Sequence, residues 1–186
     1  MIDSRPAPSP ATPEDLFARL DALGIAVTTH AHDPVFTVEE SKAGRGALPG
    51  GHCKSLFLKD KNGTLWLVVA LEDTRIDLKT LAKTLGAGRL SFAKPDLMRT
   101  VLGVEPGAVT PFALINESAR PVRVVLDSAM MAGALLNYHP LKNDRTTAIA
   151  PAGLRRFIEA CGYEPRLAVL GAALEAPPAP PPDPGD

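Results

Sequence analysis

The chain has 186 residues, and its 20 Lys and Arg residues nearly balance 21 Asp and Glu residues, so the formal net charge is −1. This balance excludes a basic nucleic-acid coat protein. A composition of 45% hydrophobic and 22% charged residues is that of a globular protein, not of a disordered or membrane one. Two cysteines are too few for a secreted disulfide framework, and no signal peptide or membrane-spanning stretch is apparent. We therefore expect a soluble, cytoplasmic protein without a membrane partner.

Proline is concentrated at the two ends of the chain. Four prolines precede Glu14 and six follow Ala176. Residues 1–12 and 172–186 are therefore expected to be Pro-rich tails with little to bury. Residues 13–171 contain no long linker, repeat or second change of composition, and they are predicted to form one domain.

The first predicted elements are two helices and a loop. Thr12 and Pro13 are suited to begin a helix that ends at Gly24. The spacing of Thr37-Val38-Glu39-Glu40 is that of a capping box and predicts a second, short helix. The glycine-rich segment 44–51 is expected to be a loop.

A β-hairpin follows, and it is the clearest local signal in the chain. Its strands are predicted over Cys53–Asp60 and Thr64–Leu71, with Asn62-Gly63 as the turn. The second strand is apolar on both faces, which favours a central position in the sheet.

The remaining predicted elements are two helices, then two strands, then a last helix, so helices are grouped rather than placed after every strand. Helices are predicted from Leu78 to Leu85, over about 95–101, and from Pro151 to Gly162. Strands are predicted over 112–115 and 122–127, joined by a turn over 116–120. In the latter strand Val122, Val124 and Leu126 should point inward, and Arg123 and Asp127 outward. This order indicates an α+β fold with a mixed, largely antiparallel sheet flanked by helices.

Metal-ligating and nucleophilic side chains are few. No GxGxxG, P-loop, GxSxG or HExxH motif is present. The candidate metal ligands are His30, His32, His52, His139, Cys53 and Cys161. His30 and His32 would share one side of a strand, but zinc needs a third or fourth converging ligand, so we expect no metal site. Cys161 lies on the apolar stripe of the last helix, and His52 would face away from Cys53 and could not activate it.

Three segments carry groups that could act on a substrate. Lys54 shares strand parity with Leu56 and Leu58, so it either points toward a partly enclosed face or extends into solvent at the start of its strand; periodicity favours neither. The segment Gly107–Pro111 could present backbone N–H groups to a carbonyl or an oxyanion. In the third segment, Tyr138-His139-Pro140-Leu141-Lys142-Asn143, Pro140 holds His139 in an extended conformation.

The ordered combination of Lys54, a GxxxP loop and His139-Pro140 resembles the YbaK/ProX family, the free-standing relatives of the editing domain of bacterial prolyl-tRNA synthetases. The resemblance covers about residues 16–169 and includes the segments 109–114, 139–143 and 146–149. It is greatest to the ProX group, which removes alanine from mischarged proline tRNA. It implies hydrolysis of the ester at the 3′ end of tRNA without cofactor, metal or protein nucleophile, by means of backbone donors, a held water and a substrate ribose hydroxyl.

The resemblance also implies roles for individual residues. Lys54 would anchor the 3′ end of the substrate, Gly107 would open the loop that orients the carbonyl, and His139 would position the substrate. The expected substrate-binding residues are Ala108, Val109, Thr110, Pro111, Lys142, Arg145, Lys42 and Arg45. Phe36, Val38, Leu48 and Met130 are suggested as lining of the amino-acid pocket, although core packing explains them equally well.

Three alternatives stay open at this stage. One is a metal-dependent small-molecule hydrolase, which would require bound zinc. The substrate could be cysteine on proline tRNA, as in the YbaK group. The chain could instead be a non-catalytic module that binds tRNA or prolyl-tRNA synthetase.

Overall fold

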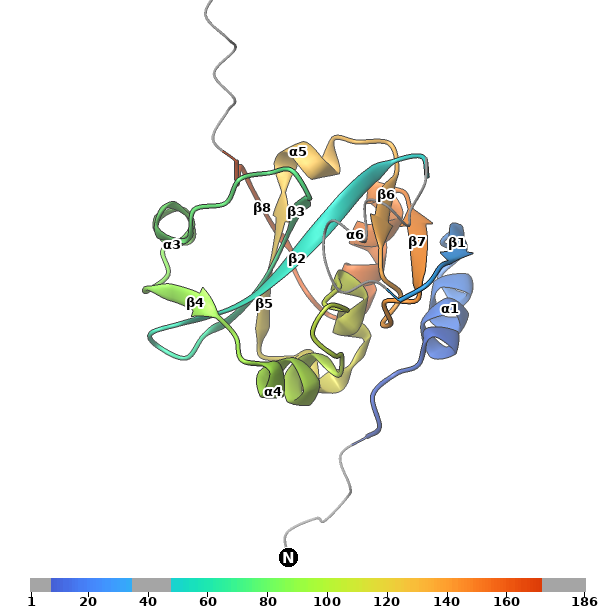
Figure 1. Ribbon diagram of the computed structural model, residues 1–186, viewed down its shortest axis with the longest axis horizontal. Coiled ribbons are helices and arrows are strands. Elements are labelled where there is room, and N and C mark those ends of the chain that lie inside the picture. The colour runs from blue at the N-terminus through green and yellow to red at the C-terminus, as the bar shows by residue number, and fades with distance from the viewer. Residues whose placement is uncertain (1–7, 35–47, 172–186) are drawn as a thin grey trace, which may run out of the picture.

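The computed structural model, which describes residues 8–34 and 48–171, is built around one eight-stranded sheet (Figure 1). The strand order is β1-β7-β6-β2-β3-β5-β8, with β4 paired to β2. The strands are β1 (Val27–Ala31), β2 (Gly51–Asp60), β3 (Leu65–Leu71), β4 (Leu90–Phe92), β5 (Val122–Asp127), β6 (Leu136–Tyr138), β7 (Arg145–Ile149) and β8 (Arg166–Ala168). Pairs β1–β7, β2–β3, β2–β4 and β6–β7 are antiparallel, and β2–β6, β3–β5 and β5–β8 are parallel. The predicted α+β class with a mixed sheet is confirmed.

Helices and helical turns connect and cover the strands. They are α1 (Pro13–Ala22), α3 (Leu78–Leu85), α4 (Pro95–Leu97), the π-helical η1 (Met98–Leu102), the 3-10 helices η2 (Pro111–Ile115) and η3 (Glu117–Ala119), α5 (Ser128–Met131) and α6 (Pro151–Ala160). The predicted caps are present: the Thr12 side chain accepts from the N–H of Asp15, while the Asp15 carboxylate accepts from that of Thr12. Gly86 ends α3 with a φ of +65°.

Strand β3 is central, as predicted, and its two faces contribute to different hydrophobic cores. Leu65, Leu67 and Val69 belong to the larger core, which also contains buried residues of α1 and α6. Trp66, Val68 and Ala70 belong to a second core with buried residues of α3. Because both faces are covered, the strand can be apolar throughout.

The segment 112–115, predicted as a strand, is instead the 3-10 helix η2. Pro111 occupies its first turn, and the Thr110 hydroxyl accepts from the backbone N–H of Phe112 at 3.3 Å. A proline at the start and a threonine cap favour a helical turn. A short, fully buried apolar run does not by itself distinguish a strand from a buried helical turn, which explains the error.

Asp127 was predicted to point into solvent, but it is buried at the end of β5. Its Oδ1 accepts from the backbone N–H of Leu170 at 3.2 Å. The alternation rule fails here because the face that carries Asp127 is covered by the segment around β8. Arg123 is exposed as predicted, and its guanidinium lies 5.3 Å from the centre of the Trp66 ring.

Five strands were not predicted: β1, β4, β6, β7 and β8. Three of them have only three residues each, so periodicity has nothing to act on. The short helix predicted over 37–40 lies outside the described residues.

Candidate active site

Tyr138 joins the three segments that sequence analysis singled out. Its ring meets that of Phe112, the residue after the GxxxP loop, edge to face at a centroid distance of 5.8 Å. Its hydroxyl donates to Met130 Sδ at 3.2 Å and also interacts with the thiol of Cys53, the residue before Lys54. Tyr138 itself precedes His139. Residues adjacent to Lys54, Pro111 and His139 therefore pack on one side chain.

Strand register supports the same convergence. In the parallel pair β2–β6, Gly51 lies opposite Leu136 and His52 opposite Asn137. If the same register is extended by two residues beyond the paired positions, Lys54 lies opposite His139.

Lys54 points toward a partly enclosed face, which decides between the two orientations that its periodicity left open. It is half-buried, it lies opposite Ala70 of the second core, and its Nζ donates to the backbone carbonyl of Thr74. Burial lowers the pKa of Lys54, and the nearby carboxylates of Asp73 and Glu72 partly offset this effect. The ammonium is therefore held in place by the segment that leads to α3.

His139 is half-buried, and its orientation is fixed by a backbone bond. Its Nδ1 lies 3.1 Å from the carbonyl oxygen of Arg145. Because a carbonyl only accepts, Nδ1 is the donor of this bond. The ring of His32 lies 6.1 Å away, with Nε2 at 2.9 Å from the hydroxyl of Thr146. The bond to the Arg145 carbonyl thus fixes the orientation of the His139 ring.

The GxxxP loop offers two backbone donors. The N–H of Ala108 donates to the Glu105 carbonyl at 3.0 Å. No group within residues 8–34 and 48–171 accepts from the N–H of Gly107 or Val109. Gly107 has a φ of +88°, and a Cβ there would meet no atom within 4 Å. The loop can thus bring N–H groups close to a carbonyl oxygen.

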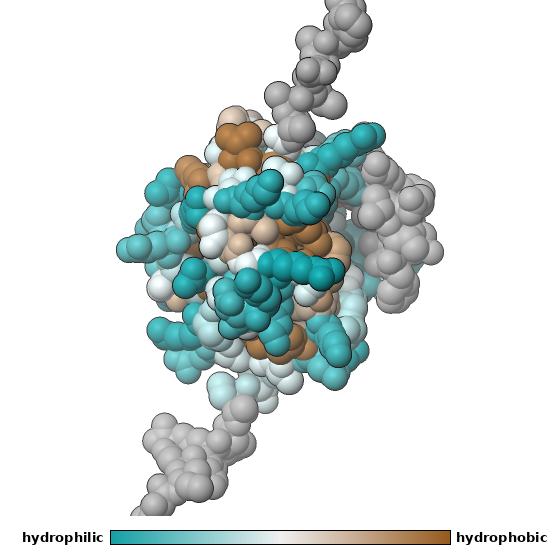
Figure 2. Space-filling model, turned by 90° about the vertical axis from the view of Figure 1, so that its left-hand side faces the viewer, coloured by the Kyte–Doolittle hydropathy of each residue, from teal (hydrophilic) through white to brown (hydrophobic). Residues whose placement is uncertain are grey.

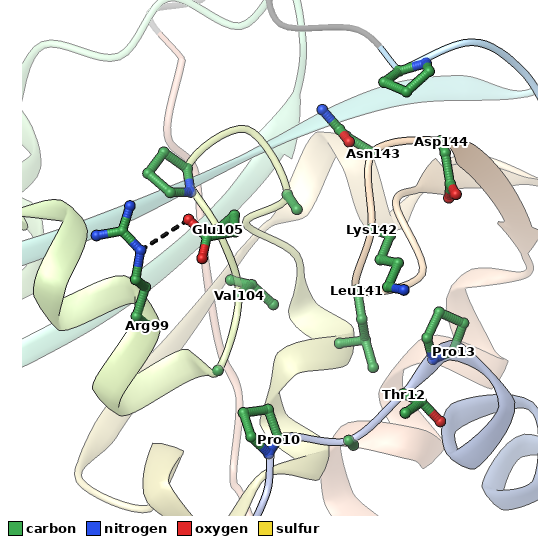
Figure 3. A pocket seen from close by; sticks show the side chains of 15 residues that line it. Pro10, Thr12, Pro13, Arg99, Val104, Glu105, Leu141, Lys142, Asn143 and Asp144 are labelled. Atoms are coloured by element: carbon green, nitrogen blue, oxygen red, sulfur yellow. Dashed lines mark hydrogen bonds and ion pairs between the residues drawn. The ribbon is translucent and has the colours of Figure 1, made fainter.

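A cavity of about 600 Å³ adjoins this loop (Figure 3). It lies between the segment before α1, the loop 103–108 and the turn 141–144. Leu141 and Lys142 border it, and Arg99 and Glu105 form an ion pair at 2.8 Å beside it. Of the predicted site residues, Ala108 and Lys142 contribute to its lining, so the loop and the segment after His139 face each other across it.

The other predicted contact residues occupy diverse positions. Lys142 is exposed, whereas Thr110 and Pro111 are buried and shape η2. Arg145 forms ion pairs with Asp144 at 3.0 Å and with Glu14 at 3.7 Å. Met130 is fully buried in the larger core, and Leu48 is half-buried. Lys42, Arg45, Phe36 and Val38 lie outside the described residues.

The cysteines are poor nucleophiles in this structure. Burial raises the pKa of the Cys53 thiol to about 11, and it raises that of Cys161 likewise to about 11. Both thiols are therefore protonated at neutral pH. Cys161 packs against the larger core, as its position on the helix stripe predicts.

Residues 8–34 and 48–171 contain neither a cluster of metal-ligating side chains nor a membrane-spanning helix. Within that part of the chain, no three His, Cys, Asp or Glu side chains are grouped so that they could hold a metal ion. None of the helices described there is long and apolar enough to cross a bilayer.

Sequence reasoning missed two contacts at the site. The acceptor for Lys54 is a main-chain carbonyl, that of Thr74, which no residue type can reveal. His32 was considered only as a metal ligand, yet it lies beside His139 just after β1 ends. The order of His32 and Thr146 in the chain gives no sign that they meet.

Comparisons with a family model and with individual proteins identify the same family. The family model described as an aminoacyl-tRNA editing domain matches residues 32–157. The chain is 36% identical over 148 residues to the prolyl-tRNA editing protein ProX of Acetoanaerobium sticklandii, covering 79% of this chain and 90% of that protein. It is 40% identical over 152 residues to the prolyl-tRNA synthetase associated domain-containing protein 1 of Bos taurus, covering 79% and 88%.

Solved structures agree on the fold. A crystal structure described as a candidate trans-editing enzyme for prolyl-tRNA synthetase superposes with a TM-score of 0.64 at 21% identity, covering 86% of this chain and 96% of that one. At 21% identity this structural similarity shows a common fold only, whereas the sequence matches show the family. The chain belongs to the YbaK/ProX family of aminoacyl-tRNA editing domains.

Proposed function

We propose that this protein is a trans-editing deacylase that hydrolyses the ester between a wrongly attached amino acid and the 3′ end of proline tRNA. The observation that carries the proposal is membership of the editing-domain family. The packing of Cys53, Phe112 and Tyr138 supports it, because it joins the backbone segments that contain Lys54, Pro111 and His139. The name of the ProX relative also supports it.

Each segment supplies a different interaction with such a substrate. The ammonium of Lys54 is suited to the charged phosphate near the 3′ end. The N–H groups of Gly107 and Val109 can polarise the ester carbonyl and stabilise the oxyanion that forms on attack by water. The imidazole of His139, oriented by its bond to the Arg145 carbonyl, can contact a substrate hydroxyl. These groups orient the ester and stabilise charge, and none of them has to form a covalent intermediate.

Alanine is the amino acid that we propose for removal. A synthetase pocket shaped for proline excludes alanine weakly, because missing methylenes change binding by only about 1–3 kcal/mol. A second site is therefore needed, and the His139-Pro140-Leu141 segment resembles that of the alanine-specific group. We also propose that the chain needs neither a metal nor a cofactor, and that its partners are the acceptor end of the tRNA and, in the cell, prolyl-tRNA synthetase.

The test is release of labelled amino acid from proline tRNA charged separately with alanine, cysteine and proline, with chelator-treated enzyme. Loss of alanine alone supports the proposal in full. Loss of cysteine instead assigns the chain to the YbaK substrate, and loss of correctly charged proline contradicts an editing role. Hydrolysis that needs added metal contradicts metal independence. No turnover, with tRNA binding retained, favours a non-catalytic module.

A further inference from the structure

The basic side chains of this nearly neutral protein are not evenly distributed. Six exposed cations lie on β2, on α3 and around β4, and we call them the α3–β4 basic face: Lys59, Lys61, Lys79, Lys83, Arg89 and Lys94. Figure 2 looks onto this side of the molecule and shows long hydrophilic side chains over it. A net charge of −1 therefore conceals a local excess of positive charge.

The six cations form no ion pair with any described residue. The ion pairs of the structure involve arginines elsewhere: Arg99, Arg120, Arg145 and Arg155. Four of the six cations lie close together in two pairs. Lys79 and Lys83 are one turn apart on α3, whose apolar residues face the second core. Lys61 and Arg89 are neighbours because the backbone N–H of Lys61 donates to the carbonyl of Arg89 at 3.0 Å.

The acidic residues near the α3–β4 basic face are mostly engaged within the fold. Asp60 is buried, and its Oδ1 accepts from the N–H groups of Asn62 and Thr64 at 2.8 and 3.0 Å. Asp77 caps α3 by accepting from the N–H of Thr80 at 2.8 Å, although its charge still acts on Lys79. Asp96 pairs with Arg99. Hydrogen bonds leave the charges of Asp60 and Asp77 in place, but the six cations outnumber these two carboxylates, so the outward field of this face is positive.

An exposed aromatic ring accompanies the cations. Phe92 is 61% exposed and lies on β4 opposite Leu58, whose side chain belongs to the second core beneath α3. Burying this ring is favourable, and an aromatic face among cations is suited to stacking against a nucleobase. An acidic protein surface would use the cations but would leave the ring without a comparable partner.

We propose that the α3–β4 basic face binds the sugar–phosphate backbone of RNA, as a second contact surface that holds the body of the tRNA while its 3′ end enters the site. This inference rests on the proposed function. Strand β2 links the two regions, since Lys54 lies five residues from Lys59, about 17 Å at roughly 3.3 Å per residue (Figure 1). That separation matches a contact several nucleotides away from the reacting ester.

The test compares charge reversal on this face with a matched reversal on the opposite side. The variant is Lys79→Glu/Lys83→Glu, and the control, with the same change of charge, is Arg155→Glu/Arg156→Glu at two exposed positions of α6, which packs on the other core. Binding of uncharged proline tRNA is measured by fluorescence anisotropy over a series of salt concentrations. We expect the variant to raise Kd by about tenfold or more at low salt and to lower the slope of log Kd against log salt by about 2, while the control changes neither.

A second measurement separates this surface from the active site. Alanyl ester on a short CCA fragment, which is too short to reach the α3–β4 basic face, should be hydrolysed equally by the wild type and the variant. Phe92→Ala should weaken tRNA binding by roughly tenfold with the salt slope unchanged. If wild type hydrolyses no ester, the proposed function fails, yet the binding comparison still decides this inference. Equal Kd values for wild type and variant, an equal loss in the control, or displacement of tRNA by polyglutamate at matched charge would each overturn it.

Discussion

The rings of Phe112 and Tyr138 meet edge to face, 5.8 Å apart, and this contact fixes the GxxxP loop against the segment that carries His139. Each residue is adjacent in sequence to a proposed site residue, and both are buried. The relative position of two segments of the site is thus determined by core packing rather than by direct bonds between them. Changes at Tyr138 should therefore affect activity through position.

Tyr138→Phe should preserve the site, whereas Tyr138→Leu should not. The phenylalanine keeps the ring and loses the hydroxyl with its contacts to Met130 and the Cys53 thiol, at a cost of about 1 kcal/mol in unfolding free energy. Leucine loses the edge-to-face contact and leaves unfilled space, at about 2–3 kcal/mol. Urea unfolding and deacylation should show near-normal activity for the first variant and a marked loss for the second. Equal activity of two folded variants would contradict a positioning role for the ring.

Lys54→Met should reduce deacylation strongly without lowering stability. Burial lowers the pKa of Lys54, which means that the folded state disfavours the charged form relative to water. Methionine keeps the apolar stem and removes that unfavourable charge. We expect a loss of at least tenfold in kcat/KM, with a urea midpoint equal to or above that of the wild type. Normal deacylation would remove Lys54 from the site.

His139→Asn and His139→Ala should both impair deacylation. The asparagine amide can keep a bond to the Arg145 carbonyl, so this variant tests the ring and its Nε2 apart from the local backbone contact. We expect both variants to lose activity and the asparagine variant to stay closer to wild type in stability. Wild-type rates for both would refute the assignment.

Much of the fold could be predicted because its signals are local. The Thr12 cap, the Asn62-Gly63 turn and the continuous apolar run of β3 each depend on a few neighbouring residues. The 3-10 helix at Pro111–Ile115 was mistaken for a strand because burial on all sides removes periodicity. Asp127 was misplaced because the cover over its face comes from residues 40 positions later.

The candidate site likewise has features that follow from local sequence and features that depend on long-range contacts. Lys54, Gly107 and His139 could be chosen from their order in the chain, but nothing local indicates that Tyr138 connects them. Contacts such as Lys54 with the Thr74 carbonyl or His139 with the Arg145 carbonyl depend on backbone positions, which sequence patterns do not encode. The α3–β4 basic face was also invisible, because it gathers residues from β2, α3 and β4.

Stability should decrease in alkaline solution as the buried thiols ionise. The folded pKa of Cys53 is raised to about 11 from 9.0, so the folded state holds its proton more tightly than the unfolded chain. This contribution is complete below pH 9 and is lost as pH rises through 11. Urea midpoints should therefore fall as the pH rises from about 9 to about 11, and Cys53→Ala should flatten that fall. A wild-type profile that is flat, or one that rises, would contradict the burial of the thiol.

Gly107→Ala should abolish most deacylation because of where its Cβ would lie. The residue has a φ of +88°, so alanine adds backbone strain of about 1 kcal/mol, although no atom of the described residues other than its chain neighbours lies within 4 Å of the added carbon. Backbone strain alone cannot explain a loss of deacylation if a glycine-to-alanine change at another position with positive φ leaves deacylation unchanged. The space that the methyl would fill is the space through which a substrate carbonyl must approach the loop N–H groups.

Gly162→Ala is the matched control for that change. Gly162 follows α6 with a φ of +91° and also has no atom within 4 Å of an added Cβ. Both variants should lose about 1 kcal/mol in urea unfolding, but only Gly107→Ala should lose deacylation, by a factor of about 100 if a preorganised oxyanion donor is displaced. Equal activities of Gly107→Ala and Gly162→Ala would show that the loop at Gly107 makes no contact with the substrate. A larger loss for Gly107→Val than for Gly107→Ala would support steric exclusion of the substrate, since the added bulk extends into the same open space.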